Sequence, residues 1–160
     1  VATEQVGSFI GKAAAAGTRF KKDNLTVQIL PMIEQDDFDR LLWLCDFNFI
    51  RGEDSFVRAQ WAARPFVWHI YPQDEEAHMV KLHAFLDMYL SGLPKDAADN
   101  IRRFWAMWND RENIKTVSEN RLNLGEIAPE WSQYATDWFK KLTVQDDLAC
   151  RLLRFINTLR

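Results

Sequence analysis

Apolar residues gather in three short stretches of the first half of the chain, and each stretch has the length and pattern of a β-strand. Between these stretches, apolar positions recur at the spacing of an α-helix. The predicted strands span residues 25–30, 46–50 and 66–70, and the predicted helices span residues 35–44 and 55–63, after an alanine-rich helix over residues 1–16. Each strand is therefore separated from the next by a helix.

This order of elements predicts the fold class. Strands that alternate with helices are typical of βα units, whose strands form a parallel sheet. Because crossovers between parallel strands are right-handed, the turns after the three strands should lie along one edge of that sheet. These turns begin at Pro31, Arg51 and Tyr71. We expect an α/β fold in which one sheet edge collects residues from three loops.

The second half of the chain is predicted to be helical, because stripes of large apolar side chains repeat at helical spacing in four segments. Gly92 and Pro94 separate the first two segments. The third is expected to begin near Pro129, and Thr143 is a candidate cap for the fourth. The stripes are Leu82, Phe85, Leu86 and Tyr89; Ile101, Phe104, Trp105 and Trp108; Ile127, Trp131, Tyr134 and Trp138; and Leu148, Leu152, Phe155 and Leu159.

Length and composition limit the classes of protein to consider. The chain of 160 residues suits one domain over residues 1–160, and its formal net charge of −3 gives no reason to expect nucleic acid or an anionic membrane as a partner. No apolar run approaches the ~20 residues that span a bilayer, and the chain does not start with a signal-peptide pattern. Cys45 and Cys150 lie in apolar surroundings without metal-ligand spacing, which predicts two buried thiols in a cytoplasmic protein.

The turn after the middle strand contains the most chemically informative residues. It reads Arg51-Gly52-Glu53-Asp54-Ser55-Phe56, where a strand ends and a helix begins. Such a junction binds anions in α/β proteins, because the helix start presents unpaired N–H groups and the positive end of its dipole. Arg51 adds a guanidinium fork for phosphate oxygens, and Gly52 allows the backbone to approach a ligand closely.

The two carboxylates in this turn leave two interpretations open. Glu53 and Asp54 are able to accept hydrogen bonds from the hydroxyl groups of a sugar. Carboxylates at the start of a helix are also often simple caps. In the plainer interpretation, Asp54 or Ser55 caps the helix and Arg51 belongs to a surface ion pair. Taken alone, the residues favour that plainer interpretation.

A longer stretch of sequence changes this balance. Residues 41–73 form a continuous stretch that is rich in Trp and Phe. The pattern extends upstream through Gln35-Asp36-Asp37-Phe38-Asp39-Arg40 and Leu30-Pro31, and it extends downstream through residues 77–86. This sequence closely resembles the EarP family, bacterial protein-arginine rhamnosyltransferases that modify elongation factor P. The resemblance covers essentially the whole chain and is most specific between residues 30 and 90.

The resemblance implies a GT-B glycosyltransferase, in which two Rossmann-like domains face a cleft. By this resemblance, the chain would correspond to the carboxyl-terminal, donor-binding domain and would begin just after the first strand of that domain. The amino-terminal domain would be missing, together with the acidic residue proposed as the family's catalytic base. The implied reaction transfers rhamnose from dTDP-β-L-rhamnose to an arginine guanidino nitrogen of elongation factor P, with inversion. The isolated chain is expected to bind dTDP and to transfer nothing.

The resemblance also implies roles for particular residues. Main-chain groups of Ile33, Glu34 and Gln35, with the Gln35 side chain, would pair with the thymine base. Phe38 would stack on that base. Met32 stands where the family often has an aromatic residue, so a polarizable thioether would pack there instead.

In the second loop, Arg51, Asp54 and Ser55 would contact the diphosphate of the donor, with Gly52 letting the backbone approach. Glu53 matches a catalytically important glutamate, which would support the transferring sugar electrostatically or position the donor. Tyr71 would lie near the ribose or the phosphates.

No cofactor and no metal ion are expected. Asp36, Asp37 and Asp39 do not share one helix face, and His69 and His78 lack a third ligand at suitable spacing, so packing roles are favoured for both histidines. Two other functions stay open. One is a non-catalytic α/β interaction domain, and the other is a transferase that uses another nucleotide sugar.

Overall fold

The computed structural model describes residues 7–8, 11, 15–109 and 124–159. It divides into two units, Val1–Arg40 and Leu41–Arg160, which are described separately. Of the helix expected over residues 1–16, only residues 7–8, 11 and 15–16 belong to the described part, so most of this prediction lies outside it. Among the described residues, no helix is both long and apolar enough to cross a lipid bilayer.

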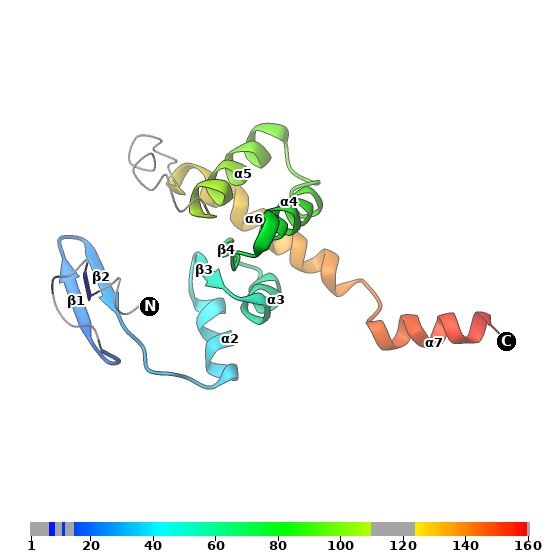
Figure 1. The fold of residues 1–160 in the computed structure, drawn as a ribbon, viewed down its shortest axis with the longest axis horizontal. Coiled ribbons are helices and arrows are strands. Elements are labelled where there is room, and N and C mark those ends of the chain that lie inside the picture. The colour runs from blue at the N-terminus through cyan, green and yellow to red at the C-terminus, as the bar shows by residue number, and fades with distance from the viewer. Residues whose placement is uncertain (1–6, 9–10, 12–14, 110–123, 160) are drawn as a thin grey trace. The chain divides into compact units, whose positions relative to one another are not determined.

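The first unit contains a β-hairpin (Figure 1). Strand β1 (Arg19–Lys22) pairs antiparallel with β2 (Leu25–Gln28), and Asp23 in the turn has a φ of 53°. Aspartate tolerates this left-handed conformation in tight hairpin turns. The prediction that the strand over residues 25–30 belongs to the parallel sheet is therefore wrong. Alternation of apolar residues identifies a strand but not its partner, and β1 reads Arg-Phe-Lys-Lys, which is too polar to stand out.

Helix α2 (Gln35–Leu44) has the bounds that its apolar spacing predicts, and it runs from the first unit into the second. In the second unit, β3 (Asn48–Arg51) and β4 (Phe66–His69) pair in parallel, with Arg51 opposite His69, and α3 (Glu53–Trp61) connects them. The βα unit predicted for this part of the chain is confirmed. The carboxyl ends of two strands, not of three, share one edge of this sheet.

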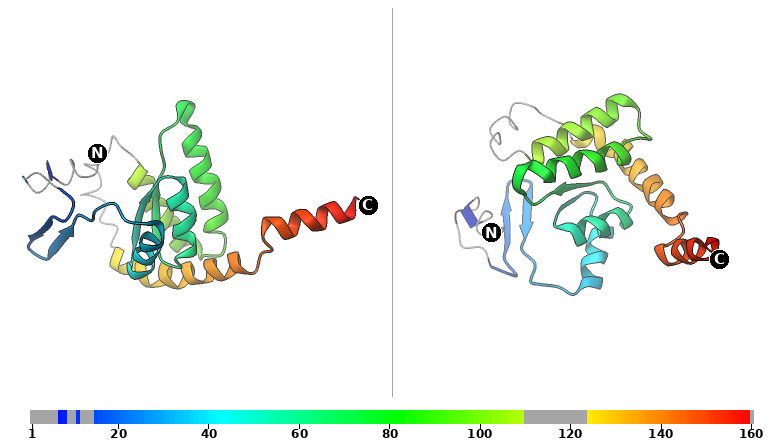
Figure 2. Two further views of the ribbon diagram at one scale, coloured as in Figure 1. Left: turned by 90° about the horizontal axis from the view of Figure 1, so that it is seen from below. Right: turned by 45° about the vertical axis from the view of Figure 1, so that its right-hand side comes forward.

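Four longer helices follow within the part of the chain that the structure describes. They are α4 (Ala77–Tyr89), which comes after the short 3₁₀ turn η1 (Asp74–Glu76), α5 (Lys95–Asn109), α6 (Leu124–Thr143) and α7 (Leu148–Thr158). Helices α3 to α6 gather around the β3–β4 pair (Figure 2). The mixed α/β architecture with a short parallel sheet is the class that the sequence predicts.

The core of the second unit is largely aromatic. The predicted stripe of α4 is buried throughout, and Phe66 of β4 packs against Phe85, Tyr89 and Trp105. Trp131 Nε1 donates a hydrogen bond of 3.0 Å to Tyr89 Oη. Burial raises the pKa of Tyr89, so its hydroxyl stays neutral in the core. Buried polar groups need such partners, and the aromatic core provides one here.

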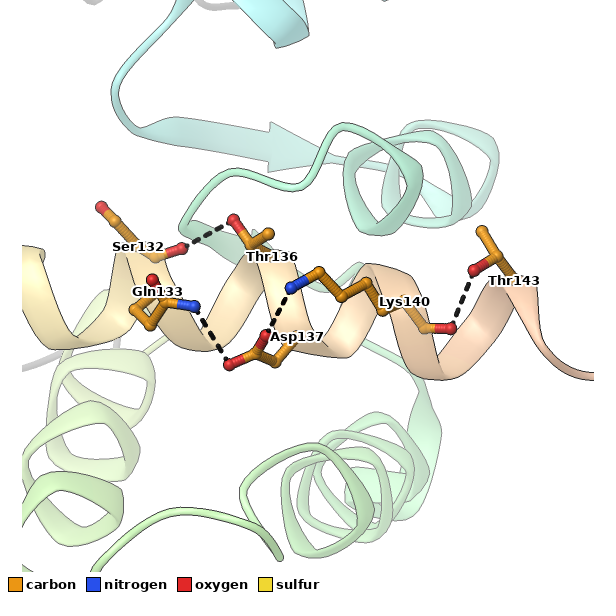
Figure 3. Close-up of polar contacts among 6 residues, drawn as sticks. All are labelled: Ser132, Gln133, Thr136, Asp137, Lys140 and Thr143. Atoms are coloured by element: carbon orange, nitrogen blue, oxygen red, sulfur yellow. Dashed lines mark hydrogen bonds and ion pairs between the residues drawn. The ribbon is translucent and has the colours of Figure 1, made fainter.

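The opposite face of α6 is polar (Figure 3). Gln133 Nε2 donates to Asp137 at 3.2 Å, and the Lys140 ammonium lies 3.1 Å from the same carboxylate. These contacts, with the Gln133 bond first, lower the pKa of Asp137. The face of α6 opposite Trp131 and Trp138 is thus exposed to solvent, and its polar side chains pair with each other along the helix.

Three details of the helical half differ from the predictions. Helix α6 begins before Pro129, which lies inside it, and Thr143 ends α6 by donating to Lys140 O at 2.8 Å. Asp147 caps α7 instead, because its carboxylate accepts from Cys150 N at 2.8 Å. The Ile127 side chain lies outside the described part.

Both cysteines and the last helix are more exposed to solvent than the sequence predicts. Cys45 and Cys150 are exposed rather than buried, because each lies on a surface-facing part of a helix or its end. The α7 stripe has the predicted spacing, yet α7 contains no buried residue. An apolar stripe shows that a helix is amphipathic, and it does not show what covers it.

Candidate functional site

The junction between β3 and α3 leaves the start of a helix without a side-chain cap. Gly52 is the N-cap residue, with φ 90° and ψ 165°, and Phe56 N donates to its carbonyl at 3.3 Å. This conformation is essentially restricted to glycine. Neither Asp54 nor Ser55 is the cap residue, in contrast to the plainer interpretation of the sequence. The first N–H groups of α3 have no intrahelical acceptor, so they are available to an anionic ligand.

Tyr71 packs across this junction from the end of β4. The Arg51 guanidinium carbon lies 4.7 Å from the centre of the Tyr71 ring, a cation–π geometry. A Cβ atom at Gly52 would lie 3.6 Å from Tyr71 Cε2, which is ordinary contact distance. Within the described residues, Arg51 forms no ion pair. The structure therefore brings Arg51, Gly52 and Tyr71 together as predicted and leaves the guanidinium fork open to solvent.

The two carboxylates of the turn have different surroundings. Asp54 accepts from Arg58 Nε at 3.1 Å, one turn along α3. Glu53 is exposed, and its side chain forms no hydrogen bond or ion pair within the described part of the chain. The Ser55 side chain is half-buried beside them. Only Asp54 has a positive partner of its own, so Glu53 is the carboxylate available to a ligand.

The residues predicted to bind a base lie in the first unit, before and within α2. Ile33 and Phe38 are half-buried, while Met32 is 99% exposed. Phe38 N donates to Glu34 O at 3.0 Å, so that carbonyl belongs to the start of the helix. The first main-chain N–H groups of α2 have no acceptor within the helix.

Two further residues fix the loop after β4. Gln73 N donates to His78 Nδ1 at 3.1 Å, which gives His78 a structural role. Asn109, at the end of α5, hydrogen-bonds the backbone of Trp68 and Ile70. Sequence reasoning missed Asn109, because a polar residue at a helix end is too common to be a signal. Among the described residues, no group of three or more His, Cys, Asp or Glu side chains is placed to hold a metal ion.

Comparison with known proteins shows which family the chain matches. A family model described as elongation factor P (EF-P) rhamnosyltransferase EarP matches residues 1–157. A protein-arginine rhamnosyltransferase of Pseudomonas aeruginosa is 50% identical over 141 residues, which cover 88% of this chain and 37% of that protein. The corresponding protein of Shewanella oneidensis is 43% identical, over 91% of this chain and 36% of that protein.

A solved structure also matches. It is described as the structural basis for EarP-mediated arginine glycosylation of translation elongation factor EF-P, and its sequence is 39% identical. The TM-score is 0.80, and the match covers 98% of this chain and 48% of that one. The chain spans about a third of the length of the curated relatives it matches.

Proposed function

The chain belongs to the EarP family of elongation factor P rhamnosyltransferases, and we propose on that basis that it is the donor-binding part of a protein-arginine rhamnosyltransferase. The reaction would transfer rhamnose from dTDP-β-L-rhamnose to an arginine of elongation factor P, with inversion. In this proposal residues 1–160 form one Rossmann-like domain of a GT-B enzyme. The acceptor side would belong to the part of the relatives that this chain does not match, since the match covers 37% of the Pseudomonas aeruginosa protein.

The uncapped start of α3 beside Arg51 is the observation that carries the proposal. A diphosphate needs several N–H donors and a positive charge, and this junction offers both without a metal ion. The Tyr71 ring packs against one face of the Arg51 guanidinium, at 4.7 Å from its carbon. The N–H edge of the guanidinium would then donate to phosphate oxygens. The Ser55 hydroxyl would add a donor. Asp54, already paired with Arg58, would contribute its main-chain N–H rather than its carboxylate.

Glu53 would act on the sugar and not on the diphosphate. Its carboxylate follows Gly52 directly and has no positive partner in the described part of the chain. A carboxylate near the anomeric carbon stabilises the positive charge that develops as dTDP leaves. The acceptor guanidinium is a poor nucleophile, since its very high pKa keeps it protonated at neutral pH, and it would have to be held and polarised by other carboxylates.

The thymine base would be recognised by the segment before α2. Main-chain groups of Ile33, Glu34 and Gln35 would pair with its edge, and Phe38 would stack on its ring. Met32 is fully exposed in the structure and would cover the other face of the base through its thioether.

Titration calorimetry with dTDP tests the donor site directly. We expect saturable binding, and Arg51→Ala should weaken it by about 10- to 100-fold, because a charge-assisted contact is lost. Ser55→Ala should weaken it by a smaller factor. Arg103→Ala is the matched control, since Arg103 is exposed on α5 and its side chain donates a hydrogen bond to Asn100 on the same helix. A folded sample without saturable dTDP binding would contradict the proposal and favour a non-catalytic interaction domain.

Two more measurements separate the parts of the site. Glu53→Gln should bind dTDP as the wild type does, because dTDP lacks the rhamnose that Glu53 would contact. The same variant should lower turnover of the complete enzyme by about 10²- to 10³-fold. Full activity in that variant would remove the role assigned to Glu53. Competition between dTDP and UDP tests the base segment, and equal affinity would favour a transferase for another nucleotide sugar.

A further inference from the structure

The Asn109 side chain forms three hydrogen bonds, and two of them connect the end of α5 to the end of β4. Its Nδ2 group donates to Trp68 O at 2.9 Å and to Trp105 O at 2.9 Å, and its Oδ1 accepts from Ile70 N at 3.1 Å. Both ends of the carboxamide are therefore used. The bond to Trp105 lies one turn back along the same helix and fixes the side chain, while the other two bonds reach the strand.

The two bonds to the strand reproduce the pairing of a parallel sheet. In a parallel ladder, one residue donates to the carbonyl before its partner and accepts from the N–H after it. Asn109 does the same around His69, with a side chain in place of a backbone. Asn48 N donates to Pro65 O at 2.9 Å. The backbone N–H and C=O groups of every second residue, counted from Pro65, therefore point towards β3. Trp68 and Ile70 then face the other edge, which pairs with no strand among the described residues.

This pairing lies next to the proposed diphosphate site. Ile70 is buried, and its N–H is the last backbone donor before Tyr71. The Tyr71 ring covers Arg51 and lies 3.6 Å from the position that a Cβ atom would take at Gly52. Arg51 is also opposite His69 in the β3–β4 register. The direction in which the chain leaves β4 at Ile70 therefore determines where the Tyr71 ring lies. That ring in turn limits the orientations open to the guanidinium.

We propose that Asn109 is a positioning residue for the diphosphate-binding group: by replacing a neighbouring strand at the end of β4, it holds Tyr71 over Arg51. The functional part of this inference rests on the donor-binding role proposed above. Its structural part does not, because the placement of Tyr71 on Arg51 is measurable without any ligand. Asn109 itself does not touch the donor.

The test compares Asn109→Asp with Asn100→Asp in the complete polypeptide. The first change keeps an acceptor for Ile70 N–H but removes both donors and sets a carboxylate against two carbonyl oxygens. Asn100 is on the same helix and accepts from Arg103, a contact that an aspartate retains. The ring current of Tyr71 shifts the NMR signals of the Arg51 side chain. We expect Asn109→Asp to abolish that shift and Asn100→Asp to preserve it.

Binding of dTDP supplies the second measurement. We expect Asn109→Asp to weaken binding by about tenfold, since a set of buried hydrogen bonds is broken. In a Tyr71→Ala background, Asn109→Asp should weaken dTDP binding by less than about twofold, because Asn109 acts on the donor site only through Tyr71. Equal losses with and without Tyr71 would overturn the proposal and indicate a merely structural role.

The outcomes separate this inference from the proposed function. If the wild type does not bind dTDP, the donor-binding role fails, and the Arg51 ring-current shift still decides the role of Asn109. If Asn109→Asp does not fold, Asn109→Ser keeps one short polar group at the same position and is measured in its place. An unchanged Arg51 signal in a folded Asn109 variant overturns the inference under all conditions.

Discussion

Two residues with positive φ lie at the ends of α3, and only one of them is a glycine. Gly52 precedes the helix with φ 90°, and Ala63 follows it with φ 53°. A side chain raises the energy of both conformations, by about 1–2 kcal/mol in the left-handed helical region and more in the region that Gly52 occupies. Glycine therefore stands at the start of α3, where we propose that the backbone approaches the ligand. At the other end of the helix, Ala63 adopts a conformation that is unfavourable for alanine.

The reciprocal substitutions should change stability in opposite directions. Gly52→Ala is expected to destabilise the fold by about 1–3 kcal/mol, because its φ and ψ suit glycine alone. Ala63→Gly relieves a left-handed alanine and should be neutral or stabilising by up to about 1 kcal/mol, after the entropy of the unfolded chain is included. Urea denaturation of both variants measures this. The assignment fails if Gly52→Ala unfolds at the wild-type midpoint.

At the scale of elements, the sequence predicts local structure well and tertiary partners poorly. The apolar spacing of α2 and the stripe of α4 agree with the structure, because helical periodicity records which face is apolar. The same reasoning assigned β2 to the wrong sheet, since a strand pattern is identical in antiparallel and parallel pairs. In the site, the Arg51 turn and Tyr71 were predictable from strand ends. Asn109 was not, because a side chain that replaces a strand has no sequence pattern.

The last helix allows a prediction about one cap. Asp147 accepts hydrogen bonds from the Cys150 backbone N–H and from its thiol, and these bonds lower the pKa of Asp147. The cap is thus present above the ordinary pKa of an aspartate and is lost as pH falls through the lowered value. Asp147→Ala should reduce the helical circular dichroism of α7 at neutral pH. Asp147→Asn retains an acceptor, so it should keep the helix and remove this part of the acid dependence.

A difference in acid response between wild type and Asp147→Asn is the decisive observation. If both lose helical signal identically as pH falls, Asp147 does not act as the cap. The midpoint of global unfolding should change little in either variant, because no residue of α7 is buried and the core contains none of its side chains.

At the scale of the whole molecule, stability should come from the aromatic core of the second unit and hardly at all from α7. Leu82 and Leu152 each belong to the apolar stripe of a helix, yet Leu82 is 0% exposed and Leu152 is 53% exposed. Leu82→Ala should cost about 2–5 kcal/mol, because it removes buried methyl groups and leaves a cavity. Leu152→Ala should stay within about 0.5 kcal/mol. Urea denaturation of the two variants gives both values by one method. A loss at Leu152 comparable to that at Leu82 would mean that α7 is packed in solution, and it would move the boundary of the core to include the last helix.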